Sequence, residues 1–209
     1  IWILTNLGLV KYDGKKYTLV PMDEKLKIGF NSKLILDHNK RIWICDEAGE
    51  IFRMESGRIK KMPEVRQKAN EPIAGFYGDA QLAFFSKGGI TVHVEDNQTI
   101  RSGKLDWLPD EEIFSILQIN DVYYVGLKGK IIRKKDRALE TIPLPPDLSG
   151  NPVQYISKDR NGILWIHSGG SLCILDEKGI RKKKQKDFTG NLIFSVFKDR
   201  NQSIWVATD

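Results

Sequence analysis

The stretch KDRNGILWIHSGG, Lys158 to Gly170, decides the fold, because the chain repeats most of it as KDRNQSIWVATD from Lys198 to Asp209. Both stretches place a tryptophan six residues after an aspartate, within a short apolar run. A motif that returns at a fixed spacing is typical of repeat architectures, and it predicts the fold before any local propensity does. The rest of the chain carries the same pattern.

A large aromatic residue occurs six times at intervals of 40 or 41 residues. A glycine follows it by five or six residues in five of these repeats, and an aspartate stands six residues before it in three. The aromatic residues are Trp2, Trp43, Phe84, Tyr124, Trp165 and Trp205, the glycines are Gly8, Gly49, Gly89, Gly129 and Gly170, and the aspartates are Asp37, Asp159 and Asp199. We expect all of them to be structural.

Each repeat contains four short apolar runs separated by turn formers, followed by a linker of about ten residues. The runs around the aromatic residue are continuous rather than alternating, as expected for strands that are buried on both faces. No helical period of useful length appears in the sequence. The predicted fold is all-β: a β-propeller of about five four-stranded blades of 40–41 residues, with residues 1–209 forming one propeller segment.

The aromatic strand occurs six times, but the glycine-led strand after it occurs five times. A closed ring needs equal numbers of both strands. The count therefore favours an arc of a larger ring, of seven blades, and a segment cut from a longer chain. A second arrangement also fits the count: a separately closed ring of five blades in which one terminal strand is displaced.

The fourth strand of each blade is expected to be the exposed outer edge, and it is the basic one in RIKKM, residues 58–62, and IRKKKQK, residues 180–186. Lysine on an edge strand discourages pairing between sheets. We favour this role over nucleic-acid binding, although the formal net charge is +6.

The pattern D-x-N-G-x-L-W-I-x-(S/T)-x-x-G-L closely resembles the two-component regulator propeller repeat. The best matches are Asp159, Asn161, Gly162, Leu164, Trp165, Ile166 and Ser168, with Trp2, Ile3, Thr5, Gly8, Leu9 and Tyr12 at one end of the chain and Ile204, Trp205, Val206 and Thr208 at the other. In this family, such propellers form the periplasmic sensor region of hybrid two-component histidine kinases of Bacteroidetes, which detect oligosaccharides. The resemblance implies a periplasmic, homodimeric sensor whose membrane anchor and kinase lie in other parts of the chain.

Catalysis is not expected from this segment. Glycosidase chemistry needs two carboxylates at a fixed separation, and no such pair stands out. The histidines His38, His93 and His167 have no metal-ligand spacing, and no phosphate-binding loop is present. We therefore expect no metal and no cofactor, and we interpret Cys45 and Cys173 as buried, inert thiols.

A binding surface remains, and propeller geometry places the glycine turns and the linkers on one face. The glycine turns supply Asn6, Asp46, Glu47, Lys87, Lys128, His167 and Ser168, and the linkers supply Arg66, Lys68, Lys104 and Trp107. Trp107 is out of phase with the repeat, so it either packs the linker down or forms a platform for a sugar ring. The predicted ligand residues are Trp107, Lys104, Arg66, Lys68, Lys87, Lys128 and His167, and the surrounding charge suits an acidic or sulfated oligosaccharide.

The sequence is also consistent with a second function. The same face could dock another protein, so that the chain acts as a non-catalytic scaffold for protein–protein interaction without any small ligand.

Overall fold

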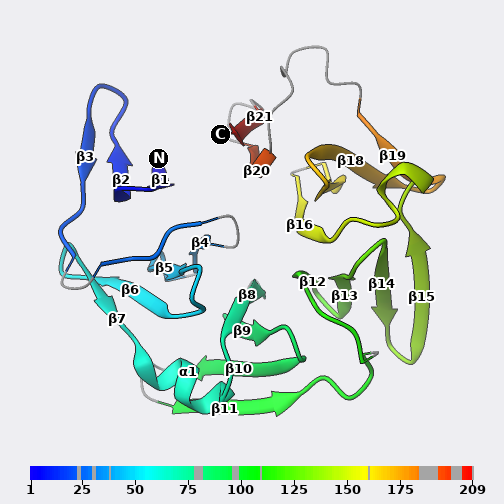
Figure 1. Cartoon of the computed structure of the whole chain (residues 1–209), viewed down its shortest axis with the longest axis horizontal. Coiled ribbons are helices and arrows are strands. Elements are labelled where there is room, and N and C mark those ends of the chain that lie inside the picture. The colour runs from blue at the N-terminus through cyan, green and yellow to red at the C-terminus, as the bar shows by residue number, and fades with distance from the viewer. Residues whose placement is uncertain are drawn as a thin grey trace. The chain divides into compact units, whose positions relative to one another are not determined.

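The computed structural model describes residues 1–22, 25–29, 32–37, 39–77, 82–95, 99–108, 110–159, 161–183, 193–198 and 204–208, without the side chains of 95, 99–102, 193–198 and 204–208. The chain forms two compact units, Ile1–Asp110 and Glu111–Asp209 (Figure 1). Asp199 and His38 lie outside the described residues, and Trp205 is described only as part of a strand. That residues 1–209 form a single propeller segment, and the size of its ring, stay predictions.

The first unit contains three antiparallel sheets whose strands pair in chain order. The first sheet holds β1 (Trp2–Thr5), β2 (Gly8–Tyr12) and β3 (Tyr17–Leu19); the second holds β4 (Lys33–Leu36), β5 (Ile42–Cys45), β6 (Ile51–Glu55) and β7 (Arg58–Lys61); the third holds β8 (Ile73–Tyr77), β9 (Ala83–Ser86), β10 (Ile90–Glu95) and β11 (Thr99–Lys104). Strand β7, which carries the basic RIKK residues, is an edge strand as predicted.

The second unit follows the same plan. The fourth sheet holds β12 (Ser115–Ile119), β13 (Val122–Gly126), β14 (Lys130–Lys135) and β15 (Ala138–Pro143); the fifth holds β16 (Val153–Lys158), β17 (Leu164–Ser168), β18 (Ser171–Asp176) and β19 (Gly179–Lys182); β20 (Ile193–Lys198) pairs with β21 (Ile204–Thr208). The described part thus has four four-stranded sheets, one of three strands and one of two, which is the material of about five blades and confirms the predicted fold class.

A short helix, α1 (Pro63–Ala69), occupies the linker between the second and third sheets, where the residues show no recognisable helical period. Pro63 stands in its first turn, and Asn70 ends it in the left-handed conformation, with φ of 56°. Val65 and Ala69 of the helix enter the core between these sheets. Seven residues span two turns, which is too short for a helical period to be recognised.

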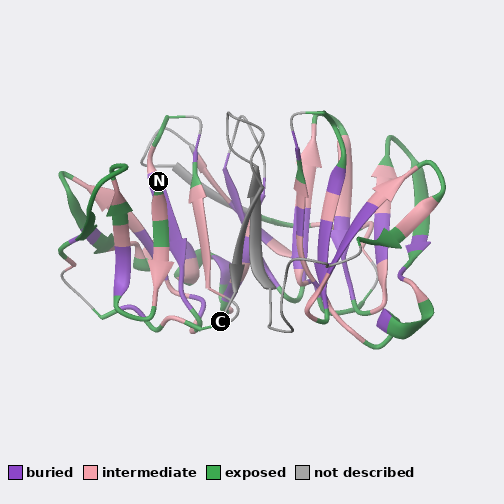
Figure 2. Ribbon diagram, turned by 90° about the horizontal axis from the view of Figure 1, so that it is seen from above, coloured by how far each residue is buried: buried purple, intermediate pink, exposed green. Residues whose placement is uncertain are grey.

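Several repeat aromatic residues pack in the cores between neighbouring sheets. The Trp43 and Phe84 rings meet edge to face at 5.4 Å, and both side chains are fully buried. Tyr124 packs against the core shared by the fourth and fifth sheets. The buried residues form interrupted bands along the strands of each unit (Figure 2). Deleting such a side chain would leave a cavity, so these residues stabilise the fold.

The repeated aspartate and tryptophan are joined directly. The Trp43 indole Nε1–H donates to Asp37 Oδ2 at 2.9 Å, and the Trp165 indole donates to Asp159 Oδ2 at 3.0 Å. The other carboxylate oxygen accepts turn amides, from Arg41 at 2.8 Å and from Ile163 at 3.0 Å. One carboxylate therefore closes the turn and orients the indole, which explains the fixed spacing of six residues.

The repeat glycines are needed where a turn meets the linker of the next sheet. Gly49 has φ of 71°, and a Cβ there would lie 2.6 Å from the Ile73 backbone nitrogen. Gly129 has φ of 72°, and a Cβ there would overlap the Ser149 carbonyl oxygen. Left-handed φ and close backbone approach both favour glycine.

Candidate functional site

The glycine turns and the linkers lie together at one end of the sheets in each unit. In the first unit, Glu47 N donates to Lys27 O at 2.8 Å and Ile73 N to Gly49 O at 3.3 Å. In the second, Gly129 N donates to Asn151 O at 2.9 Å. These bonds bear out the expectation that turns and linkers share a face. We call it the turn–linker face of each unit.

Three of the predicted ligand residues come together at this end of the third sheet. Lys104 is the last residue of β11 and pairs with Ile90, just after the turn that carries Lys87. Leu105 N then donates to Gly89 O at 3.2 Å, which ties the segment with Trp107 to the same turn. Lys87 and Lys104 are exposed and Trp107 is half-buried. We call Lys87, Lys104 and Trp107 the Trp107 cluster.

The Glu71 carboxylate, which no sequence pattern indicated, borders this cluster. The Ser86 hydroxyl donates to Glu71 Oε1 and accepts a hydrogen bond from Ile90 N at 3.0 Å. Both Glu71 carboxylate oxygens would lie 3.2 Å from a Cβ on Gly88. The cluster is therefore of mixed charge, with an acidic group beside its cations. The sequence signal that could have indicated Glu71 is its position directly before a proline at the end of the linker.

Arg66 and Lys68 lie on α1, which packs against β10 and β11. Arg66 Nη1 binds the Glu50 carboxylate, whose other oxygen lies 3.4 Å from Lys61 Nζ. Arg66 thus ties the helix to the second sheet, whereas Lys68 is exposed. The structure separates two residues that look equivalent in the sequence.

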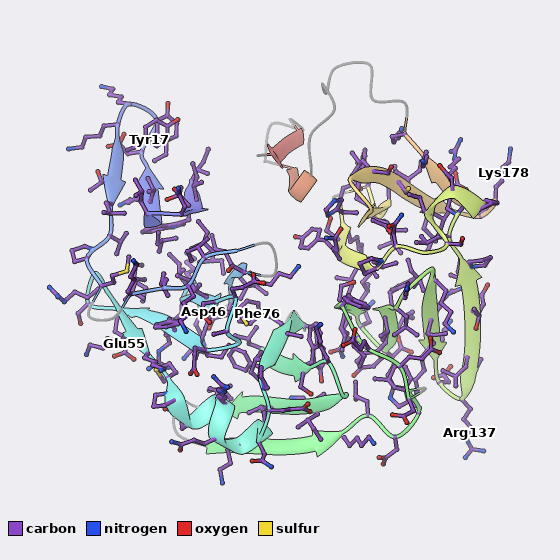
Figure 3. All side chains as sticks on the ribbon, in the orientation of Figure 1. Tyr17, Asp46, Glu55, Phe76, Arg137 and Lys178 are labelled. Atoms are coloured by element: carbon purple, nitrogen blue, oxygen red, sulfur yellow. The ribbon has the colours of Figure 1, made fainter. Side chains whose placement is uncertain are left out.

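Three residues expected on the exposed face are buried instead. Ser168 is fully buried, and its hydroxyl donates to Pro152 O at 2.9 Å. His167 lies within β17, and its side chain is 3% exposed. Asp46 is also 3% exposed, and its Oδ1 accepts the Ala48 and Glu50 amides at 3.0 and 2.9 Å (Asp46 is labelled in Figure 3). Asp46 closes the glycine turn just as Asp37 closes the preceding one. Lys128, in the second unit, is exposed, and it forms an isolated antiparallel β-bridge with Pro152.

Lys33 is a lysine that the sequence did not single out. It is the first residue of β4, and it pairs with Cys45 on β5. Burial lowers the pKa of the Lys33 ammonium to about 8, and the neighbouring Glu47 carboxylate opposes this shift. A fraction of its amine is therefore uncharged near neutral pH.

The two cysteines are buried thiols, as predicted. Burial raises the pKa of the Cys45 thiol, which donates to Ile73 O at 3.3 Å, and raises the pKa of Cys173 to about 11. Both groups are therefore protonated at neutral pH.

Within the described residues, no group of three or more histidine, cysteine, aspartate or glutamate side chains could hold a metal ion. None of the described helices is long and apolar enough to cross a membrane.

Residues 147–170 match the family model of the two component regulator propeller. This segment is similar in sequence to the two component regulator propeller repeat. The match contains Asp159 and Trp165, the pair joined by the indole hydrogen bond, and it confirms the family resemblance carried by these residues. No curated protein matches the chain in sequence.

Solved structures similar to the chain include extracellular domains of putative one component and hybrid two component systems from B. thetaiotaomicron. The domain of the putative hybrid two component system BT3049 has a TM-score of 0.67 at 17% identity, over 99% of this chain and 30% of that one. The domain of the putative one component system BT4673 has a TM-score of 0.63 at 21% identity, over 100% of this chain and 29% of that one. The chain therefore spans less than a third of these two domains.

An enzyme has the same fold. Virginiamycin B lyase from Staphylococcus aureus has a TM-score of 0.63 at 15% identity, over 99% of this chain and 76% of the lyase. At this identity the likeness concerns the fold alone, and function has to be argued from the residues of the site.

Proposed function

We propose that the chain is the ligand-binding propeller of a sensor of the two-component type, located outside the cytoplasmic membrane. The observation that carries the proposal is the two component regulator propeller repeat at residues 147–170. The likeness to extracellular domains of sensor systems supports it. The segment itself is non-catalytic in this proposal, and it lies in the periplasm.

The ligand is an oligosaccharide, and it binds at the Trp107 cluster. A half-buried indole offers one apolar ring surface on which the C–H face of a sugar can stack. Lys87 and Lys104 are exposed beside it and can donate charge-assisted hydrogen bonds to carboxylate or sulfate groups. An acidic or sulfated glycan fits these two lysines, while Glu71 can accept hydrogen bonds from sugar hydroxyls.

The remaining cations of the first unit contribute less. Arg66 is engaged by Glu50, and Lys68 lies on the exposed side of α1. Binding passes to a kinase, carried elsewhere in the full polypeptide, through a change in dimer geometry. Such coupling requires that the ligand binds one of two conformations more tightly.

A thermal-shift screen tests the proposal with neutral, uronic-acid-containing and sulfated oligosaccharides. A ligand at 100 times its Kd stabilises the folded state by about 2.7 kcal/mol. We expect a rise in melting temperature with an acidic or sulfated glycan, lost in Trp107→Ala and reduced in Lys87→Ala and Lys104→Ala. Lys16→Ala is the matched control, because Lys16 is an exposed lysine on the β2–β3 turn.

A shift that all four variants retain would contradict binding at this cluster. If no glycan in the screen shifts the melting temperature, the sugar-sensing role loses its support, and a scaffold for protein–protein interaction becomes the better function.

A further inference from the structure

Glu71 lies over the glycine turn of the third sheet, next to the Trp107 cluster. Both of its carboxylate oxygens would lie 3.2 Å from a Cβ on Gly88, and Oε1 accepts a hydrogen bond from the Ser86 hydroxyl. Lys87 stands between these two residues in the turn. Glu71 is half-buried, so part of its side chain faces solvent beside the two lysines of the cluster.

A buried hydroxyl fixes the position of the Glu71 carboxylate. Ser86 is fully buried, and its hydroxyl accepts a hydrogen bond from Ile90 N at 3.0 Å while it donates to Glu71 Oε1. A hydroxyl has one proton to donate, and here the carboxylate receives it. A carboxylate offers about four lone-pair sites, so Glu71 can also accept hydrogen bonds from a ligand without leaving Ser86.

The fifth sheet carries an uncharged side chain at the same position. Asn151 directly precedes Pro152 as Glu71 precedes Pro72, and each proline directly precedes the first strand of its sheet. A Cβ on Gly169, in the glycine turn of the fifth sheet, would lie 2.5 Å from Asn151 Nδ2. Asn151 is half-buried, like Glu71. The repeat therefore places a polar side chain over the glycine turn, and the fold does not require that side chain to be charged.

The charge of Glu71 acts on the same ligand as the lysines of the Trp107 cluster. Lys87 and Lys104 attract anionic groups, whereas the Glu71 carboxylate repels them. The carboxylate accepts hydrogen bonds from sugar hydroxyls, but a sulfate ester has no proton to donate. A sugar bound at this cluster would therefore be held by an anionic group on one side and by unsubstituted hydroxyls on the other.

We propose that Glu71 sets the specificity of the Trp107 cluster, which takes uronic-acid oligosaccharides with unsubstituted hydroxyls and rejects densely sulfated ones. The inference rests on the proposed glycan-binding function and narrows its ligand class. Lys87 and Lys104 bind the carboxylate of such a glycan, and Glu71 accepts hydrogen bonds from the neighbouring hydroxyls. Sulfate at those hydroxyls would be held against the Glu71 carboxylate, so the discrimination comes from a repulsive contact.

Isothermal titration calorimetry with a matched pair of glycans tests the inference. The probes are an oligogalacturonate with free hydroxyls and the same oligosaccharide after chemical O-sulfation, at one fixed salt concentration. We expect the wild type to bind the unsulfated glycan at least about tenfold more tightly, because like charges are held together in the other complex. Glu71→Asn should bring the two affinities within about threefold of each other, because the repulsive contact is removed.

Two controls separate the charge of Glu71 from other effects. Glu177→Asn makes the same change at an exposed position between β18 and β19, and it should leave the ratio of the two affinities unchanged. Glu71→Asn should keep the melting temperature within about two degrees of the wild type, because Asn151 occupies the equivalent position of the fifth sheet.

The outcomes distinguish the inference from the function on which it rests. A wild type that binds the sulfated glycan as tightly as the unsulfated one would overturn the role of Glu71. So would an unchanged ratio in Glu71→Asn, and in both cases glycan binding at the cluster survives if Trp107→Ala abolishes it. If the wild type binds neither glycan, or if Trp107→Ala binds both as the wild type does, the proposed site and this inference fail together.

Discussion

The second and fifth sheets contain the same type of turn in different surroundings. Asp37 and Asp159 are each 8% exposed, and each carboxylate accepts the indole six residues later. Trp43 is nonetheless fully buried, whereas Trp165 is half-buried. The hydrogen bond is a property of the local turn, but the depth at which the tryptophan is buried depends on what packs over it.

The charged neighbours of the two indoles also differ. The Arg41 and Arg53 guanidinium groups lie 5.6 and 5.0 Å from the Trp43 ring, and Arg41 Nε also donates to Asp37 Oδ2 at 2.6 Å. At Trp165, the Lys183 ammonium lies 5.7 Å from the ring. Turns with the same hydrogen bond between aspartate and tryptophan should therefore contribute unequally to stability.

The largest effect is expected for Trp43→Ala. Removing a fully buried indole between two sheets leaves a cavity, and we expect a loss of about 3–5 kcal/mol in the free energy of unfolding. Urea denaturation followed by circular dichroism measures it. A loss below about 1 kcal/mol would contradict the role of Trp43 in the core.

Trp165→Ala sharpens the comparison. Its indole is already partly solvated, so we expect a smaller loss than at Trp43, about 2–3 kcal/mol. The same denaturation series measures both variants. A loss equal to or larger than that of Trp43→Ala would show that burial of the indole is not what distinguishes the two sheets.

Asp37→Asn and Asp159→Asn test the shared turn. An asparagine side chain has only one acceptor oxygen. This oxygen can accept from either the turn amide or the indole N–H, and the asparagine NH2 group cannot accept the second hydrogen bond. We expect each variant to lose about 1–3 kcal/mol. At Asp37 the substitution also removes the ion pair with Arg41. A loss below about 0.5 kcal/mol in both variants would contradict the role of the carboxylate in this turn.

Asp37 should also make stability depend on pH. Burial alone would raise the pKa of its carboxyl, but the hydrogen bonds from Trp43 and Arg41 outweigh burial and hold the pKa below its ordinary value of 3.8. A lowered pKa stabilises the folded state above 3.8, and this stability is lost as pH falls through the folded pKa. Melting temperatures below about pH 5 should therefore fall less steeply in Asp37→Asn than in the wild type. Parallel curves would contradict this.

The smallest effect on stability is expected for Trp107→Ala, outside the repeated motif. If Trp107 is a platform for a ligand, the free energy of unfolding should change by less than about 0.5 kcal/mol while glycan binding is lost. A large drop in melting temperature without ligand would mean that Trp107 packs the linker down, and the platform would be excluded.

Much of the fold followed from the period of the sequence. The aromatic residues, the glycines and the strands around them lie where the repeat predicts, because strand length and turn geometry are set by neighbouring residues. Helix α1 was missed, because its two turns are stabilised by Val65 and Ala69 in a core that the linker alone does not reveal.

The candidate site was less predictable. The sequence placed Lys87, Lys104 and Trp107 on one face, and the pairing of β10 with β11 brings them to one end of a sheet. It also treated Arg66 and Lys68 alike and expected His167 to be exposed. Arg66 instead meets Glu50, sixteen residues earlier, and His167 is covered within β17.

The sequence by itself determined the repeat, its strands and its turns, because these depend on interactions within about ten residues. The tertiary structure decided which charges are engaged and how deeply Trp43 and Trp165 are buried. Those properties depend on groups that are distant in the sequence and meet only when one sheet packs on the next.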